Sequence, residues 1–104
     1  MTITQNTAAQ TVGRLFANEV RGTPMVRGIW ARPAPEGVEI WVQVDERIDN
    51  ETELELYRIG ASLLDTFPDT FTRVFIVNPL WFDGAKQLVG DVIPSDVTPI
   101  QLAD

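Results

Sequence analysis

Residues 25–45 read MVRGIWARPAPEGVEIWVQVD and decide the fold, because they hold two strand-forming runs separated by a turn. Both runs are rich in β-branched and aromatic residues, which favour strands. The intervening segment contains Pro35, suited to the first corner of a turn, and Gly37, suited to a left-handed position. The sequence therefore predicts strands over 25–32 and 38–45, joined by a three-residue loop with a glycine bulge.

This loop sets an expected register in which Ala34 lies opposite Val38 and Trp30 lies opposite Val42. One face of the hairpin is then the core face and carries Val26, Trp30, Val38, Ile40, Val42 and Val44. The other face has an apolar strip among charged residues, and the strip consists of Met25, Ile29, Ala31 and Trp41. A slip of one residue would pair Trp30 with Trp41 and exchange some of these assignments.

Two segments have helical periodicity. Apolar residues recur at helical spacing over 8–21, which predicts one helix. A second helix is expected over 51–67, with Asn50 and Glu53 in a capping-box arrangement and Pro68 ending it. Its apolar residues form two adjacent rows, one with Leu56 and Ile59 and the other with Leu54 and Tyr57. These rows predict a helix buried over a wide arc.

A third strand is predicted over 70–77, where apolar residues on both faces are typical of an inner strand. A strand, a helix and another strand in one sheet form a right-handed crossover, so this strand should run parallel to the second. The element order is α-β-β-α-β. It predicts an α+β two-layer sandwich, a small mixed sheet with the helices on one face.

The chain is expected to be a single domain over 1–104. Residues 1–7 are polar and are predicted to be loose. Residues 79–104 carry glycine and proline at short intervals and are predicted to be an irregular, wrapping tail, with one short edge strand around 91–93 or 98–102.

Composition excludes several classes of chemistry. The 104 residues include neither cysteine nor histidine, which removes disulfides, zinc–thiolate sites, and Ser-His-Asp and Cys-His mechanisms. The net charge of −7 opposes binding to nucleic acid or to an anionic membrane. The chain shows no secretory signal and no apolar run long enough to cross a bilayer. We expect a soluble cytoplasmic protein that needs no cofactor and binds a protein partner or a second copy.

Carboxylates at the end of the second strand form the one acidic group with site-like spacing. Asp45, Glu46 and Asp49, joined by Asp83, could hold Mg²⁺ or Mn²⁺ through oxygen ligands. However, Asp49 could equally cap the following helix, and Asp45 belongs to a solvated turn. The metal site, and the divalent-metal hydrolase it would imply, is therefore the weaker interpretation.

Aromatic residues indicate a surface. Trp41 and the tail residues Trp81 and Phe82 have no obvious place in a core of this size. Either the tail folds back and covers Trp41, or part of this face stays open as an interface, since apolar patches ringed by charge commonly bind partners. The expected interface residues are Met25, Arg27, Ile29, Trp41, Trp81 and Phe82.

The sequence thus favours a small acidic protein-interaction module, working without catalysis, as a homodimer through the outer hairpin face or with another protein. The alternative in the same class is an acidic inhibitor or immunity-type partner of a basic protein. Its acidic patch would consist of Asp45, Glu46, Asp49, Glu51, Glu53 and Glu55.

Overall fold

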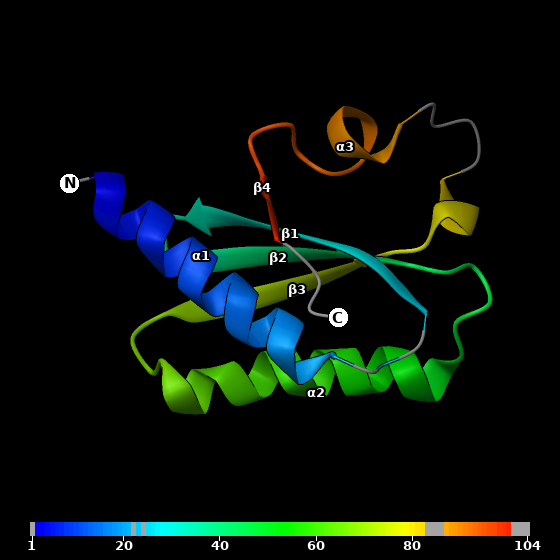
Figure 1. The fold of residues 1–104 in the computed structure, drawn as a ribbon, viewed down its shortest axis with the longest axis horizontal. Coiled ribbons are helices and arrows are strands. Elements are labelled where there is room, and N and C mark those ends of the chain that lie inside the picture. Colours follow the sequence, from blue (N-terminus) through cyan, green and yellow to red (C-terminus); the bar gives the residue numbers. More distant parts are fainter. Residues whose placement is uncertain (1, 22, 24, 83–86, 101–104) are drawn as a thin grey trace.

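A computed structural model of the chain describes residues 2–21, 23, 25–82 and 87–100. Its elements are α1 (Thr2–Glu19), β1 (Val26–Ala34), β2 (Gly37–Val44), α2 (Asn50–Thr66), β3 (Phe71–Val77), the 3-10 turn η1 (Pro79–Trp81), α3 (Leu88–Asp91) and β4 (Thr98–Ile100). The strands form one mixed sheet in the order β3-β2-β1-β4. The two long helices, α1 and α2, pack against one side of this sheet (Figure 1). This is the predicted two-layer α+β arrangement.

The core lies between the sheet and these two helices. Helix α1 contributes residues spaced by three and four, including Val12, Phe16 and Val20, and α2 contributes Leu56, Ile59 and Leu63. The strands contribute the alternating side chains that face the helices, which are Ile29, Ala31, Val38, Ile40, Val42, Val44, Ile76 and Ile100. Burial of this apolar surface is the main stabilising contribution in a chain without disulfides.

The hairpin register differs from the predicted one by one residue. Ala34 pairs with Gly37, so the loop has two residues, Pro35 and Glu36, and Trp30 lies opposite Trp41. This register pairs Ile29 with Val42 and so puts Ile29 on the core face and Trp30 on the opposite face, and the pairing shifts only beyond Gly28, towards Val26. The predicted placement of Trp30 in the core is therefore wrong, and so is the placement of Ile29 outside it.

Helix boundaries also differ from the predicted ones. Helix α1 begins at Thr2, well before residue 8. The N-cap of α2 is Asp49, not Asn50, and its carboxylate accepts a hydrogen bond of 2.8 Å from the Thr52 N–H. Of the two apolar rows of α2, only that of Leu56 and Ile59 is buried, and Tyr57 lies on the exposed side.

Strand β3 runs parallel to β2, as the crossover rule predicts. It lies at the edge of the sheet, however, so the prediction of an inner strand was wrong. The start of β3 lies very close to β2. A Cβ added at Gly37 would overlap with the backbone of Phe71. Strand β4 occupies the other edge beside β1, within the predicted window 98–102.

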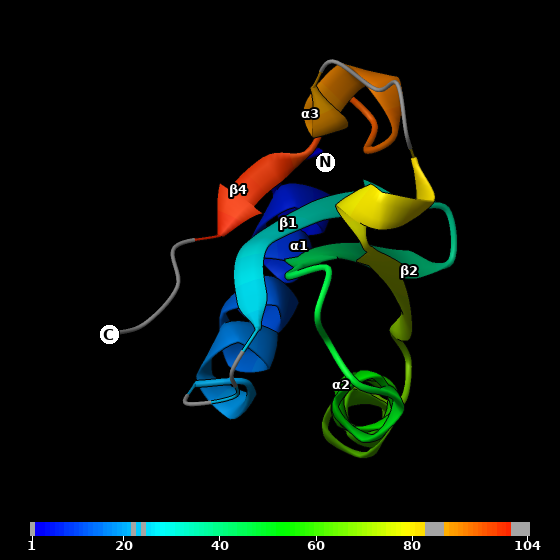
Figure 2. The ribbon, with the colours of Figure 1, turned by 90° about the vertical axis from the view of Figure 1, so that its right-hand side faces the viewer.

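The C-terminal segment lies on the side of the sheet away from α1 and α2. Figure 2 shows η1 and α3 above the strands and α2 below them. Ile93, which follows α3, is fully buried although it does not belong to the core between the sheet and the helices. The C-terminal segment therefore buries an apolar side chain of its own. None of the helices in the described ranges combines the length and apolar character needed to cross a membrane.

Candidate protein-binding face

The side of the sheet opposite α1 and α2 carries the candidate site. We call it the outer face. It is formed by alternate residues of the three long strands, namely Trp30, Arg32, Glu39, Trp41, Phe71, Arg73 and Phe75. Because β2 and β3 are parallel and in register, their outer side chains stand in rows across the sheet, Glu39 beside Arg73 and Trp41 beside Phe75.

An aromatic stack occupies the middle of the outer face. The Trp41 and Phe75 rings have centroids 4.3 Å apart and lie within 16° of parallel. The Trp41 Nε1–H group is buried and has no hydrogen-bond acceptor among the described residues. Leaving a buried donor unpaired costs about 1–3 kcal/mol.

Trp30 extends this apolar surface onto β1. Its indole lies across Gly28, because a Cβ at Gly28 would come within 2.7 Å of the Trp30 ring. Trp30 also lies opposite Trp41 in the hairpin. The two tryptophans thus belong to one surface, on which glycine at position 28 leaves room for the Trp30 ring.

Charged groups border the aromatic residues and attach the C-terminal segment. The Arg32 guanidinium donates to Glu39 at 2.7 Å and to Asp96 at 2.9 Å. Hydrogen bonds to Asp96 and Glu39 raise the pKa of Arg32. Asp96 belongs to the segment between α3 and β4, so this ion pair connects the tail to the outer face.

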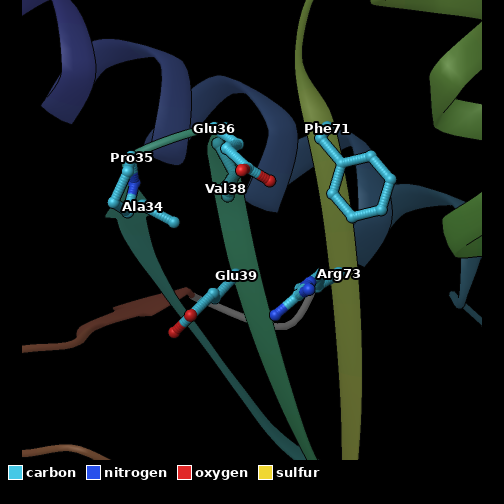
Figure 3. Close-up of a pocket in the computed structure, with 8 residues that line it drawn as sticks. Ala34, Pro35, Glu36, Val38, Glu39, Phe71 and Arg73 are labelled. Atoms are coloured by element: carbon cyan, nitrogen blue, oxygen red, sulfur yellow. The ribbon is translucent and has the colours of Figure 1, made fainter.

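The hairpin end of the outer face is hollowed by a shallow depression of about 240 Å³. Its lining consists of Ala34, Pro35, Glu36, Gly37, Val38, Glu39, Phe71 and Arg73. Figure 3 shows the Arg73 side chain pointing from β3 towards Glu39 of β2, and the Phe71 ring on the side of β3 away from the hairpin. The Arg73 guanidinium carbon lies 5.7 Å from the centroid of the Phe71 ring, within the range of a cation–π contact.

Several large apolar side chains in and next to this face are exposed. Phe71 is 46% exposed at the start of β3, and Trp81 is 52% exposed in η1. Phe82 is 38% exposed, and neither it nor Trp81 is buried by folding back over the sheet. The tail is therefore held against part of the outer face by the Arg32–Asp96 ion pair and leaves aromatic surface open.

The predicted interface residues do not all meet on this face. Ile29 is only 2% exposed and belongs to the core, so its assignment to the interface is corrected. Met25 is partly buried just before β1, and its carbonyl accepts a hydrogen bond from the Asp45 N–H. Arg27 pairs with Asp45 at 2.8 Å at the same end of the hairpin. Trp41 lies at the centre of the outer face.

The predicted carboxylate site has other functions in the fold. Asp45 accepts hydrogen bonds from Arg47 and Arg27, and these bonds hold the pKa of Asp45 well below its usual range. Asp49 caps α2, where the hydrogen bonds from Thr52 lower the pKa of Asp49. Asp83 lies outside the described residues. Within the described part of the chain, no three acidic side chains converge as a metal ion would require.

The acidic patch is less uniform than its sequence indicates. Asp45 is paired with two arginines, and Glu55 accepts a hydrogen bond of 3.2 Å from Arg58. Asp49 is engaged as the cap of α2. An acidic inhibitor surface made from these residues remains a prediction, and the pairing of its carboxylates weakens it.

Sequence reasoning missed Trp30, Phe71, Arg73 and Phe75 as members of the face. The alternation of Phe71, Arg73 and Phe75 along one strand was visible in the sequence. It does not show which residues of the neighbouring strand lie beside these side chains. The parallel register with β2 places Phe75 beside Trp41. Comparison with known proteins adds no functional assignment, because no protein-family model, no curated protein and no solved structure matches this chain.

Proposed function

We propose that this protein is a protein-interaction module that binds another protein through the open part of its outer face. The observation that carries the proposal is the set of exposed aromatic side chains along β3: Phe71 at its start, on the face of the stacked Trp41 and Phe75, and Trp81 and Phe82 beyond its end. Aromatic residues and arginine are enriched at the energetically dominant positions of protein interfaces. Arg73, next to Phe71, supplies the arginine.

A second copy bound at this face is the less favoured version of the proposal. Ile93 is buried on this side of the sheet, and Asp96 is hydrogen-bonded to Arg32. These contacts break the face into an open aromatic part and a covered part. A symmetric contact would need the same patch on both copies to be self-complementary, whereas a different protein can match the open part alone.

Site-specific photo-crosslinking tests this proposal. A photoreactive residue at position 81 or 71 should capture a discrete protein in an extract of the producing cells. The same residue at Asn18, which is exposed on α1, is the control. Excess wild-type protein should compete for the capture, and the Phe71→Ser/Trp81→Ser variant should not.

Three outcomes would contradict the proposal. Capture of the same protein from position 18 would make the contact unspecific, and no capture from 71 or 81 would leave the face without a partner. A crosslinked product of twice the chain's mass from position 81, which lies outside β3, would show that the face binds a second copy.

A further inference from the structure

The two edges of the sheet differ in their protection against pairing with another strand. Strand β4 has three residues and contains Pro99. Short length and proline are both devices that keep a sheet edge from pairing. Strand β3 has seven residues, no proline, an uninterrupted register with β2 and one charged residue, Arg73. It is a long, regular edge that lacks these devices.

Half of the backbone groups of β3 face away from β2. The Phe71 N–H donates to the Glu36 carbonyl, which shows that the odd-numbered residues of β3 are hydrogen-bonded to β2. Because backbone groups alternate sides along a strand, the groups of Thr72, Val74 and Ile76 point to the open edge. They have no backbone partner in the described part of the chain.

The side of α2 next to this edge carries exposed apolar residues, with Glu53 at its N-terminal end. A Cβ at Gly60 would overlap with the Val74 side chain, which places the Gly60 side of the helix against β3. Steps of three or four residues lead from Gly60 to an apolar row, which consists of Leu54, Tyr57, Ala61 and Leu64. Leu54 is 51% and Tyr57 45% exposed. Figure 2 shows β3 and α2 along the same side of the molecule, away from β4.

We propose that this β3–α2 border joins two copies of the chain about a two-fold axis, with β3 antiparallel to β3 of the second copy. Val74 is the midpoint of β3, and Gly60, which it touches, lies next to the midpoint of the row from Leu54 to Leu64. A two-fold axis through this point places β3 beside β3 of the second copy and the apolar row of α2 against the same row of the second copy. An unrelated extended peptide could pair with the backbone of β3 but would leave the apolar row of α2 uncovered.

The register that this axis imposes is chemically compatible. Val74 faces its own copy and exchanges both backbone hydrogen bonds with it, and Thr72 faces Ile76. On the outer face Arg73 faces Phe75 of the second copy. The one charged residue of the strand is therefore never opposite itself, which avoids the penalty of like charges across a strand pair.

Sedimentation velocity on the full chain tests the proposal through the helix row. The wild type should be a dimer at high micromolar concentration and dissociate on dilution. Leu54→Lys and Tyr57→Lys should each weaken the dimer at least about tenfold, because a lysine would be buried against an apolar row. Both side chains are exposed, so the fold should persist in circular dichroism. Leu80→Lys, 63% exposed in η1, is the matched control and should leave the dimer intact.

Hydrogen exchange tests the strand. The amides of Thr72, Val74 and Ile76 should exchange at least about tenfold more slowly at concentrations where the dimer forms than after dilution. Those of Arg73 and Phe75, already bonded to β2, should not change. A strict monomer at high concentration would overturn the proposal. So would a dimer whose Thr72, Val74 and Ile76 amides exchange independently of concentration, or one that Leu80→Lys dissociates and Tyr57→Lys does not.

Discussion

Trp30 lies directly opposite Trp41 in the pairing of β1 with β2. This pair places two indoles on the outer face and leaves the inner face to smaller aliphatic residues such as Ala31 and Ile40. The close approach of α1 depends on this division, because a Cβ added at Gly13 would come within 3.2 Å of the Ala31 methyl. One register therefore sets both the packing of α1 and the position of the candidate binding surface.

The anchoring of the C-terminal segment can be measured at Ile93. This residue is fully buried, and Ile93→Ala should destabilise the protein by about 2–5 kcal/mol, as for other large-to-small changes at buried sites. Leu80→Ala is the control, since Leu80 is 63% exposed and its truncation should change the free energy of unfolding by less than about 0.5 kcal/mol. Urea unfolding followed by tryptophan fluorescence gives both values. Equal effects of the two variants would contradict the anchor.

The identity of the α2 cap has a simple test. Asp49→Ala removes the carboxylate that accepts the Thr52 N–H, and it should lower Tm by several degrees. Asn50→Ala should have little effect, because Asn50 is the first helical residue and not the cap. Thermal unfolding at neutral pH compares the two. A larger loss in Asn50→Ala would restore the capping box expected from the sequence.

Asp45 should make stability depend on pH in the acidic range. Its pKa is lowered in the folded protein, chiefly by the hydrogen bonds from Arg47, while the unfolded chain titrates near the ordinary value of about 3.9. The folded state therefore binds fewer protons than the unfolded one, and the stabilisation is complete above about pH 5 and is lost as the pH falls below about 4.

The matched variant is Asp45→Asn. Wild type should exceed it in free energy of unfolding at pH 6, and the difference should shrink steadily towards pH 2.5, as measured by urea unfolding at each pH. A difference that is constant with pH would show that the Arg47 and Arg27 contacts do not act through the charge of Asp45.

Replacing Gly60 by alanine should destabilise the protein, which is the opposite of the usual effect of this substitution in a helix. In an exposed helix interior, Gly→Ala gains about 1 kcal/mol. In α2 the added methyl would overlap with Val74, so Gly60→Ala should destabilise by about 1–3 kcal/mol. The double variant Gly60→Ala/Val74→Ala should lose less than the sum of the two single changes. A stabilising Gly60→Ala would show that α2 and β3 are not in close contact there.

The element order and the parallel third strand were predictable, because periodicity and the crossover rule act on long segments. The register was not. In β1 the apolar residues Ile29, Trp30 and Ala31 are consecutive, so alternation cannot tell which of them face the core. The turn would have resolved this ambiguity, but Pro35 and Gly37 suit both a three-residue loop and the observed two-residue loop.

The candidate site was harder to predict for the same reason. Trp41 was identified from its size alone, but its partner Phe75 is 34 residues away along the chain and meets it only through the parallel register. The edge position of β3 could not be predicted either. Apolar residues on both of its faces indicate that both faces are covered, but they do not show whether another strand or other elements cover them. One face packs on α2, and the other carries the aromatic stack.

The parallel pairing of β2 with β3 also sets an order of events during folding. The β1–β2 hairpin closes over two residues, and hairpins of this kind form in about 1–10 μs. Strand β3 can join only after the whole α2 crossover has closed, which is entropically slower. We expect Ile40→Val to slow refolding and Ile76→Val chiefly to accelerate unfolding in stopped-flow experiments. In a newly made chain, the edge of β2 that pairs with β3 would therefore stay unpaired until β3 has joined the sheet.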